Sequence, residues 1–220
     1  MSNADIKTLI LNRGFDSQII PTLEAHLVSQ GDGKEPYDFD ANRTLVKLYQ
    51  FNPKHSKTEI YALALILSMV YGGFIEFGAL NCLIPESAKG EELFTTISQC
   101  ADLLDTCQFK AMWDSFKSIP VNVVNAKHIQ DALRGSILAT LSFTFKNTLV
   151  TNLLTMLDLK SETELKEFLK INGSNIVESV GNGTVVFYDN IENTKRAKNH
   201  QEGLGADYGA LHRLINAASE

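Results

Sequence analysis

The chain has 220 residues, of which 44% are hydrophobic and 21% charged. This composition is typical of a globular protein and excludes a wholly disordered one, and a chain of this length can bury a core without a disulfide or metal. Its 20 Lys and Arg against 26 Asp and Glu give a net charge of −6, which disfavours general binding to nucleic acid or to an anionic membrane surface.

The N-terminus and the cysteines indicate a cellular compartment. Residues 1–13 lack a basic segment followed by a long apolar run, so a signal peptide is not expected. Cys82, Cys100 and Cys107 are odd in number and irregularly spaced, which favours reduced thiols. The sequence therefore predicts a cytoplasmic protein.

Helical periodicity dominates from the N-terminus to about Phe145. The apolar stripes are Ile20, Leu23 and Leu27; Ala41, Leu45, Leu48 and Tyr49; Leu93, Ile97, Cys100 and Leu104; Phe109, Met112, Trp113 and Phe116; and Ile129, Leu133, Ile137, Leu141 and Phe145. Asp38 is the expected N-cap of the second of these helices, Asn52-Pro53 ends it, and Ser56 with Glu59 predicts a capping box for the next. Roughly eight helices with short connections predict stacked helical hairpins.

One segment has the composition of a membrane span. Ile60 to Ile75 is uncharged and largely apolar, but a span needs about 20 such residues. Gly72-Gly73 interrupts the run and Glu76 ends it. We therefore interpret it as a core helix and expect no association with a membrane.

The pattern changes after Phe145. A short helix fits Val150 to Leu157, and Ser161 with Glu164 forms a capping box for a second helix. Asn182-Gly183 lies between two β-prone runs and predicts a hairpin that ends with Val185 to Tyr188. Helix, helix and hairpin in this order indicate a winged helix.

The C-terminal end is expected to be a loop and a helix. Residues 190–203 are polar and predict a mobile loop. Tyr208, Leu211, Leu214 and Ile215 then fit an amphipathic helix. The expected division is a HEAT-like helical domain at 1–145 and a winged-helix domain at 146–220.

Two motifs carry a resemblance to a known family. Residues 37–53 read YDFDANRTLVKLYQFNP, and residues 103–114 read LLDTCQFKAMWD. Both resemble the subunit k family of eukaryotic translation initiation factor 3, although residues 190–203 and the last helix match only loosely. The resemblance implies a PCI-type module, similar to those of the proteasome lid and the COP9 signalosome.

The resemblance also implies a function. A member of this family is a non-catalytic subunit of initiation factor 3, bound chiefly by its subunit l and associated indirectly with the 40S ribosomal subunit. A small PCI-type subunit of the proteasome lid or signalosome is the alternative. Subunits co-purified with the chain would distinguish the two.

Catalytic and cofactor sites are weakly supported. A cytosolic cysteine hydrolase would need a base beside a thiol, and Cys107 with His128 is the best available pair. Cys100 and Cys107 share one apolar stripe, however, and are expected to be core residues. The histidines are scattered, and neither Gly181-Asn182-Gly183 nor Gly203-Leu204-Gly205 has the strand-to-helix context of a phosphate loop. No enzyme activity, metal or cofactor is expected.

A winged helix raises the possibility of nucleic acid, but the charge disfavours it. Residues 151–220 hold seven Lys and Arg against ten Asp and Glu, a net charge of −3. We therefore expect no specific binding to nucleic acid, and instead a protein-binding surface. Its expected apolar residues are Val185, Phe187, Leu211, Leu214 and Ile215, for each of which packing within the chain is the alternative.

Overall fold

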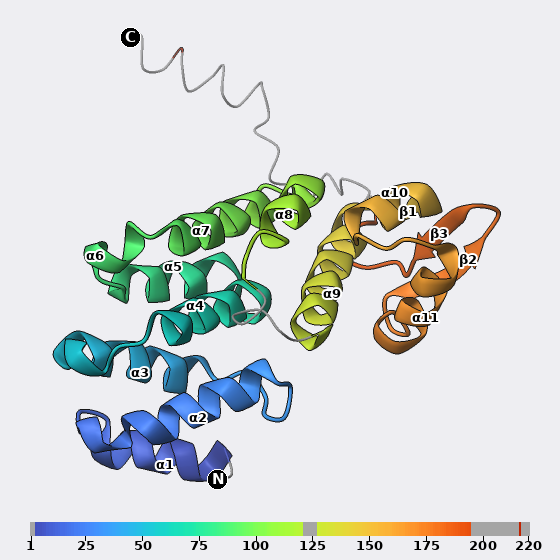
Figure 1. Ribbon diagram of the computed structural model, residues 1–220. Helices are drawn as coiled ribbons and strands as arrows, with labels where there is room; N and C mark the ends of the chain where they lie inside the picture. The colour runs from blue at the N-terminus through green and yellow to red at the C-terminus, as the bar shows by residue number, and fades with distance from the viewer. Residues whose placement is uncertain (1–2, 121–126, 195–215, 217–220) are drawn as a thin grey trace.

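The computed structural model describes residues 3–120, 127–194 and 216, and these are mostly helical with one small sheet (Figure 1). The first part comprises α1 (Asn3–Arg13), η1 (Ser17–Ile19), α2 (Ile20–Gly31), α3 (Phe39–Phe51), η2 (Pro53–His55), α4 (Thr58–Leu67), η3 (Ser68–Gly72), α5 (Gly73–Leu83), α6 (Glu86–Lys89), α7 (Glu92–Asp105) and α8 (Phe109–Phe116). The second comprises α9 (Lys127–Thr144), β1 (Asn147–Leu149), α10 (Val150–Met156), α11 (Glu162–Asn172), β2 (Val177–Gly181) and β3 (Thr184–Phe187).

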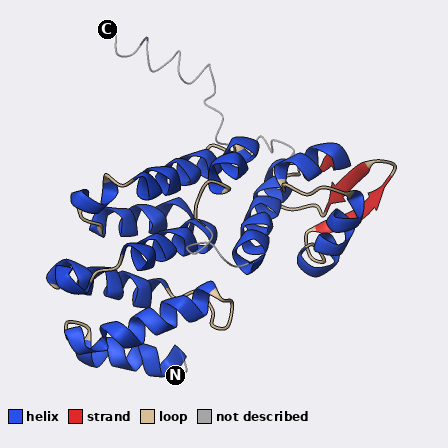
Figure 2. Cartoon of the chain, in the orientation of Figure 1, coloured by secondary structure: helices blue, strands red, loops and turns tan. Residues whose placement is uncertain are grey.

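The helices of the first part form a stack. α2 packs against α3 and α4, and α7 packs against α4 and α8 (Figure 1). The strands are confined to the other end of the molecule, beyond α9 (Figure 2). The predicted fold class, stacked helical hairpins followed by a small winged helix, is confirmed.

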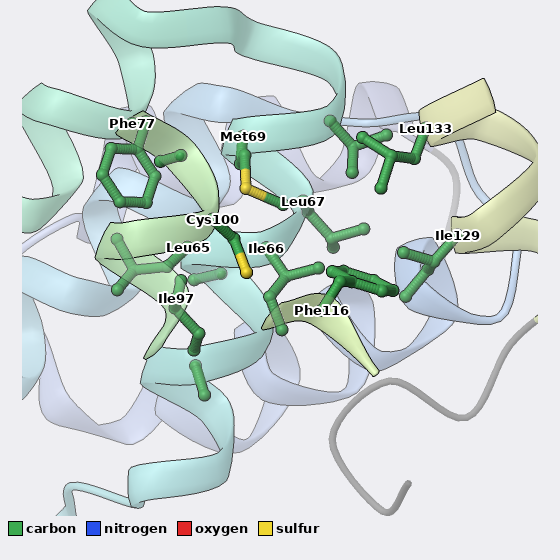
Figure 3. Close-up of a cluster of buried hydrophobic side chains, with 14 of the residues drawn as sticks. Leu65, Ile66, Leu67, Met69, Phe77, Ile97, Cys100, Phe116, Ile129 and Leu133 are labelled. Carbon is green, nitrogen blue, oxygen red and sulfur yellow. The ribbon is translucent and has the colours of Figure 1, made fainter. Parts of the chain in front are cut away.

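The predicted apolar stripes form the core. Leu27, Leu45, Ile97 and Leu133 are each 0% exposed, as expected for the buried face of an amphipathic helix. Figure 3 shows side chains from α4, η3, α5, α7, α8 and α9 meeting in one cluster, with Cys100 among them. At the end of the longest stripe, Phe145 lies beyond α9 and is 40% exposed.

The segment with the composition of a membrane span consists of α4, η3 and α5. Thr58–Leu83 is long and apolar enough to cross a membrane by length and composition, and 50% of its most apolar window is buried. η3 is a π-helical turn, and Gly73 after it has φ +64°, so the segment is not one regular helix. Ala62, Leu65 and Leu67 of α4 are completely buried in the core, as predicted for a core helix.

Two of the three predicted helix starts are confirmed. The Asp38 carboxylate accepts a hydrogen bond from the Ala41 N–H (3.1 Å), and the Ser161 hydroxyl accepts one from the Glu164 N–H (3.2 Å). The capping box at Ser56 is wrong. There η2 precedes the helix, the Ser56 hydroxyl donates to the Pro53 carbonyl (2.8 Å), and α4 begins after Lys57 without a side-chain cap.

The sheet of the winged helix has the order β1–β3–β2, and both pairs are antiparallel. Asn182 (φ 54°) and Gly183 (φ 72°) form the two-residue turn of the predicted hairpin, and positive φ at both positions is characteristic of a type I′ turn. Strand β1 was not predicted, because three residues between two helices carry no recognisable period.

Side chains of α8 and α9 hold the end of α10. The Trp113 indole N–H donates to the Met156 carbonyl (2.9 Å), and the Arg134 Nε donates to the Leu157 carbonyl (2.9 Å). The Arg134 guanidinium also lies over the Trp113 ring, 5.4 Å from its centroid. Carbonyls at a helix C-terminus lack partners within the helix, so these contacts satisfy them and join the winged helix to the stack.

Candidate protein-docking surface

Half of the large exposed apolar side chains in the described residues lie on the winged helix or at the end of α9 that leads into it. Seven of the fourteen large ones in the described residues lie between Phe143 and Ile191. They are Phe143, Phe145, Leu149, Ile171, Val180, Tyr188 and Ile191, with exposures from 39% to 79%. Such exposure in a small module is typical of a surface that another protein covers.

One edge of the sheet is formed by a strand that has a neighbour on one side only. β2 is an outer strand, and its residues Glu178 to Gly181 are all exposed. Its Val180 lies opposite Val185 of β3 and is 39% exposed, whereas Val185 is completely buried. An outer strand offers backbone hydrogen-bonding groups to another chain, so this edge can extend the docking surface.

The structure places the predicted docking residues differently. Val185 and Phe187 are each 0% exposed, because alternate residues of β3 point inward and join the core. These two residues therefore pack within the chain and cannot contact a partner from the folded state. Leu211, Leu214 and Ile215 lie outside the described residues.

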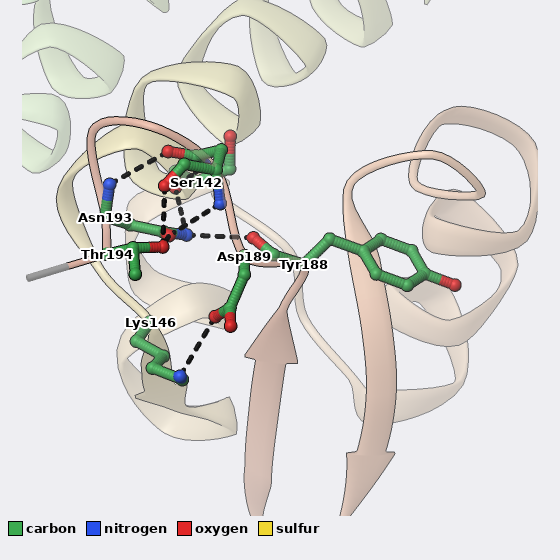
Figure 4. Close-up of polar contacts among 7 residues, drawn as sticks. Ser142, Lys146, Tyr188, Asp189, Asn193 and Thr194 are labelled. Atoms are coloured by element: carbon green, nitrogen blue, oxygen red, sulfur yellow. Dashed lines mark hydrogen bonds and ion pairs between the residues drawn. The ribbon is translucent and has the colours of Figure 1, made fainter. Parts of the chain in front are cut away.

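A polar turn holds part of the surface in place. Figure 4 shows the turn after β3 lying over the end of α9, where the Ser142 carbonyl accepts hydrogen bonds from the Asn190 (2.9 Å) and Asn193 (3.0 Å) amides. These side chains fix the start of the loop that was predicted to be mobile; residues 195–203 of it lie outside the described residues. Ile191, 68% exposed, thus lies in a turn that is hydrogen-bonded to Ser142, the residue before Phe143.

The electrostatics of the winged helix do not favour phosphate. α11 carries Glu162 and Glu164 in its first turn, where a helix that contacts nucleic acid would otherwise offer N–H groups to a phosphate. The basic cluster Lys195, Arg196 and Lys198 lies outside the described residues. The described charges therefore agree better with a protein partner than with a duplex.

A groove of about 860 Å³ runs between α9 and α11. Its charged side chains largely neutralise one another: Lys117 pairs with Asp158 (2.7 Å) and Arg134 with Asp131 (2.8 Å). Such a groove has no excess charge that would select a small ionic ligand.

The groups considered for catalysis occupy different sites. His128 Nε2 lies 2.9 Å from the Tyr71 hydroxyl, whereas Cys107 occupies the turn between α7 and α8 and lines a groove beside α10. No group of three metal-ligating side chains occurs in the part of the chain that the structure describes. The expectation that Cys107 is buried is wrong, because its φ of 58° places it in the turn with its side chain exposed.

Thiol labelling is expected to separate the cysteines. Burial raises the pKa of Cys100 to about 12, so almost no thiolate is present at neutral pH. Cys100 should react slowly in the native state and rapidly in denaturant, whereas the exposed Cys82 and Cys107 should react rapidly in both. Mass spectrometry of timed alkylation measures this, and equal native rates for all three cysteines would contradict the described packing.

Comparison with known proteins identifies the family. The model of the CSN8/PSMD8/EIF3K family matches residues 55–195. Human eukaryotic translation initiation factor 3 subunit K is 27% identical over 165 residues, 75% of each chain. The Dictyostelium discoideum protein of the same name is 31% identical over 171 residues, 75% of this chain and 66% of its own length, and that of Nematostella vectensis is 25% identical over 204 residues, 93% and 91%. The match extends from the helical stack through the winged helix, so the chain belongs to the CSN8/PSMD8/EIF3K family, with its PCI-type helical fold.

Proposed function

We propose that the chain is a non-catalytic scaffold subunit of translation initiation factor 3 in the cytoplasm. The observation that carries the proposal is the similarity, over as much as 93% of the chain, to proteins named as subunit K of that factor. The exposed apolar surface of the winged helix supports a role in assembly, since a free scaffold subunit exposes the surface that its partner buries.

The proposed partners are other subunits of the factor, chiefly subunit l, and the association with the 40S ribosomal subunit is indirect. The choice of subunit l rests on the family resemblance of the sequence motifs. A subunit of the proteasome lid or signalosome is the alternative, because the matching family also includes those proteins.

The proposed contact surface is the exposed part of the winged helix together with the adjoining end of α9. It combines Phe143 at the end of α9, Ile191 in the turn hydrogen-bonded to Ser142, and the open edge of β2. Leu211, Leu214 and Ile215 remain proposed members of it. Their apolar spacing would add a helical contact beside the sheet.

We also propose that the chain divides into a helical domain at 1–145 and a winged-helix domain at 146–220. The turn between α9 and β1 lies at this boundary. The contacts of Trp113 and Arg134 with the end of α10 cross it, so the two parts should unfold together.

Co-expression with tagged subunit l tests the function. The chain should be captured at several hundred millimolar salt, because burial of apolar surface resists screening whereas phosphate-driven binding does not. Phe143→Asp with Ile191→Asp should weaken capture about tenfold or more, because a charge placed in a buried apolar contact has no partner to compensate its loss of hydration. Leu211→Asp with Ile215→Asp should weaken it as well.

The matched control is Ile75→Asp, at a side chain that is 83% exposed on α5. This variant should be captured like the wild type. Capture of the control but not of the winged-helix variants would support the proposal. Absence of capture, together with tight, salt-sensitive RNA binding or with co-purified lid or signalosome subunits, would overturn it.

A further inference from the structure

The two most exposed large apolar side chains in the described residues, Leu11 and Phe15, lie far from the winged helix, and Phe51 lies beside Phe15. Leu11 is 86% exposed, Phe15 87% and Phe51 66%. The Phe15 and Phe51 rings contact each other, with centroids 6.5 Å apart. α1 and α3 both end on the side of the stack that faces away from α9 (Figure 1).

Local structure holds these side chains outward. Asp16 caps η1 by accepting the Gln18 N–H (2.9 Å), and Arg13 pairs with the same carboxylate. The turn that carries Phe15 is therefore fixed at both ends. Phe51 is the last residue of α3, which Pro53 prevents from continuing.

The charge around these rings is opposite to that of the whole chain. Residues 3–16 and 39–55 hold five Lys and Arg against three Asp, in a chain with a net charge of −6. Lys7, Lys47 and Lys54 form no ion pair with any described residue, whereas Arg13 and Arg43 are paired with Asp16 and Asp40.

Helix geometry places these lysines beside the apolar side chains. Lys7 is four residues before Leu11 in α1, and Lys47 is four residues before Phe51 in α3, so each pair lies on one helix face. Lys54 follows Phe51 in η2. The α1–α3 patch thus consists of Leu11, Phe15 and Phe51 with Lys7, Lys47 and Lys54.

We propose that the α1–α3 patch docks an acidic segment of a partner protein that carries Phe or Leu side chains. The apolar side chains would bury those of the segment, and the unpaired lysines match its carboxylates. This contact lies away from the proposed winged-helix contact, so one chain can bind two partners at once.

The same observations disfavour single-stranded RNA as the occupant. RNA-binding platforms stack bases on open aromatic faces and favour Arg, which stacks and forms bidentate contacts with phosphate. Here the two rings are tilted by 53° against each other, the third apolar group is Leu11, and the unpaired cations are lysines. An acidic apolar peptide fits each of these features.

Fluorescence anisotropy of the full chain tests the proposal. The probe is a labelled peptide of alternating glutamate–phenylalanine and glutamate–leucine pairs, and the competing probe is labelled oligouridine. The peptide should bind saturably at about 50 mM salt and more weakly at about 300 mM, because screening reduces the lysine contribution. Phe15→Ser with Phe51→Ser, and separately Lys47→Glu with Lys54→Glu, should each weaken binding about tenfold or more.

Matched controls separate this contact from others. Lys166→Glu with Lys170→Glu makes the same change in net charge on α11 and should bind the peptide like the wild type. Phe143→Asp with Ile191→Asp should also retain peptide binding, so a failure of the winged-helix proposal would leave this one standing. No saturable peptide binding, equal binding by all variants, or tighter binding of oligouridine would overturn it.

Discussion

Trp113→Ala is expected to lower the free energy of unfolding by about 3–5 kcal/mol, the usual range for emptying a buried aromatic site. Trp113 is 3% exposed and packs edge-to-face on Phe116, with ring centroids 5.8 Å apart. Its indole N–H satisfies the Met156 carbonyl at the end of α10. The substitution would therefore create a cavity and also leave an acceptor without its partner.

Urea melts followed by far-UV circular dichroism measure this loss, since Trp113 is the chain's single tryptophan and fluorescence would vanish with it. Trp113→Phe is the matched control. It keeps a ring in the site but loses the N–H donor, so it should cost about 1–3 kcal/mol and less than the alanine variant. A loss below about 1 kcal/mol for Trp113→Ala would contradict burial of this side chain.

Much of the fold was predictable because the spacing of apolar residues along a helix indicates which face is buried. The stripe Phe109, Met112, Trp113 and Phe116 is buried throughout, and the caps at Asp38 and Ser161 work as their residue types predict. The predictions that failed concern residues that can form more than one local hydrogen-bonded structure. Ser56 can cap a helix or close a 3₁₀ turn, and Pro53 decides for the turn.

The docking surface was less predictable, because the alternation of residues along a strand does not indicate which of its two faces is buried. Val185 and Phe187 were proposed to face a partner, with packing inside the chain as the alternative. They alternate with Thr184 and Val186, and tertiary packing, in which both join the core cluster, determines which pair is buried. Ile191 is exposed because Asn190 and Asn193 cap α9 across the fold. No pattern of residues close together in the sequence predicts a contact between this turn and α9.

Cys107 shows a related limit. Its spacing of seven from Cys100 fits one helix face, yet α7 ends at Asp105 and Cys107 adopts a left-handed conformation in the turn. Period alone extends a stripe past the end of its helix. The exposed thiol follows from the turn, not from any catalytic environment.

Phe187→Ala is expected to destabilise the isolated chain by about 3–5 kcal/mol, because Phe187 is a core residue of the winged helix. It is 0% exposed and lies opposite Val177 in the hairpin. Its backbone N–H donates to the Lys146 carbonyl (2.9 Å), which holds β3 beside the segment that leads into β1. Loss of the ring should therefore loosen all three strands, and hydrogen exchange should accelerate there before it does in α2 to α4.

Val186→Ala is the matched control, since Val186 is the neighbouring β3 residue on the opposite face and is only partly buried. It should cost less than about 1 kcal/mol. A docking role for Phe187 makes the opposite prediction: the alanine variant would melt like the wild type and would lose only its capture of subunit l. Because the two roles differ in the stability of the unpartnered chain, a denaturant melt without any partner distinguishes them. Equal melts for both variants would return Phe187 to the docking surface and would require β3 to face outward.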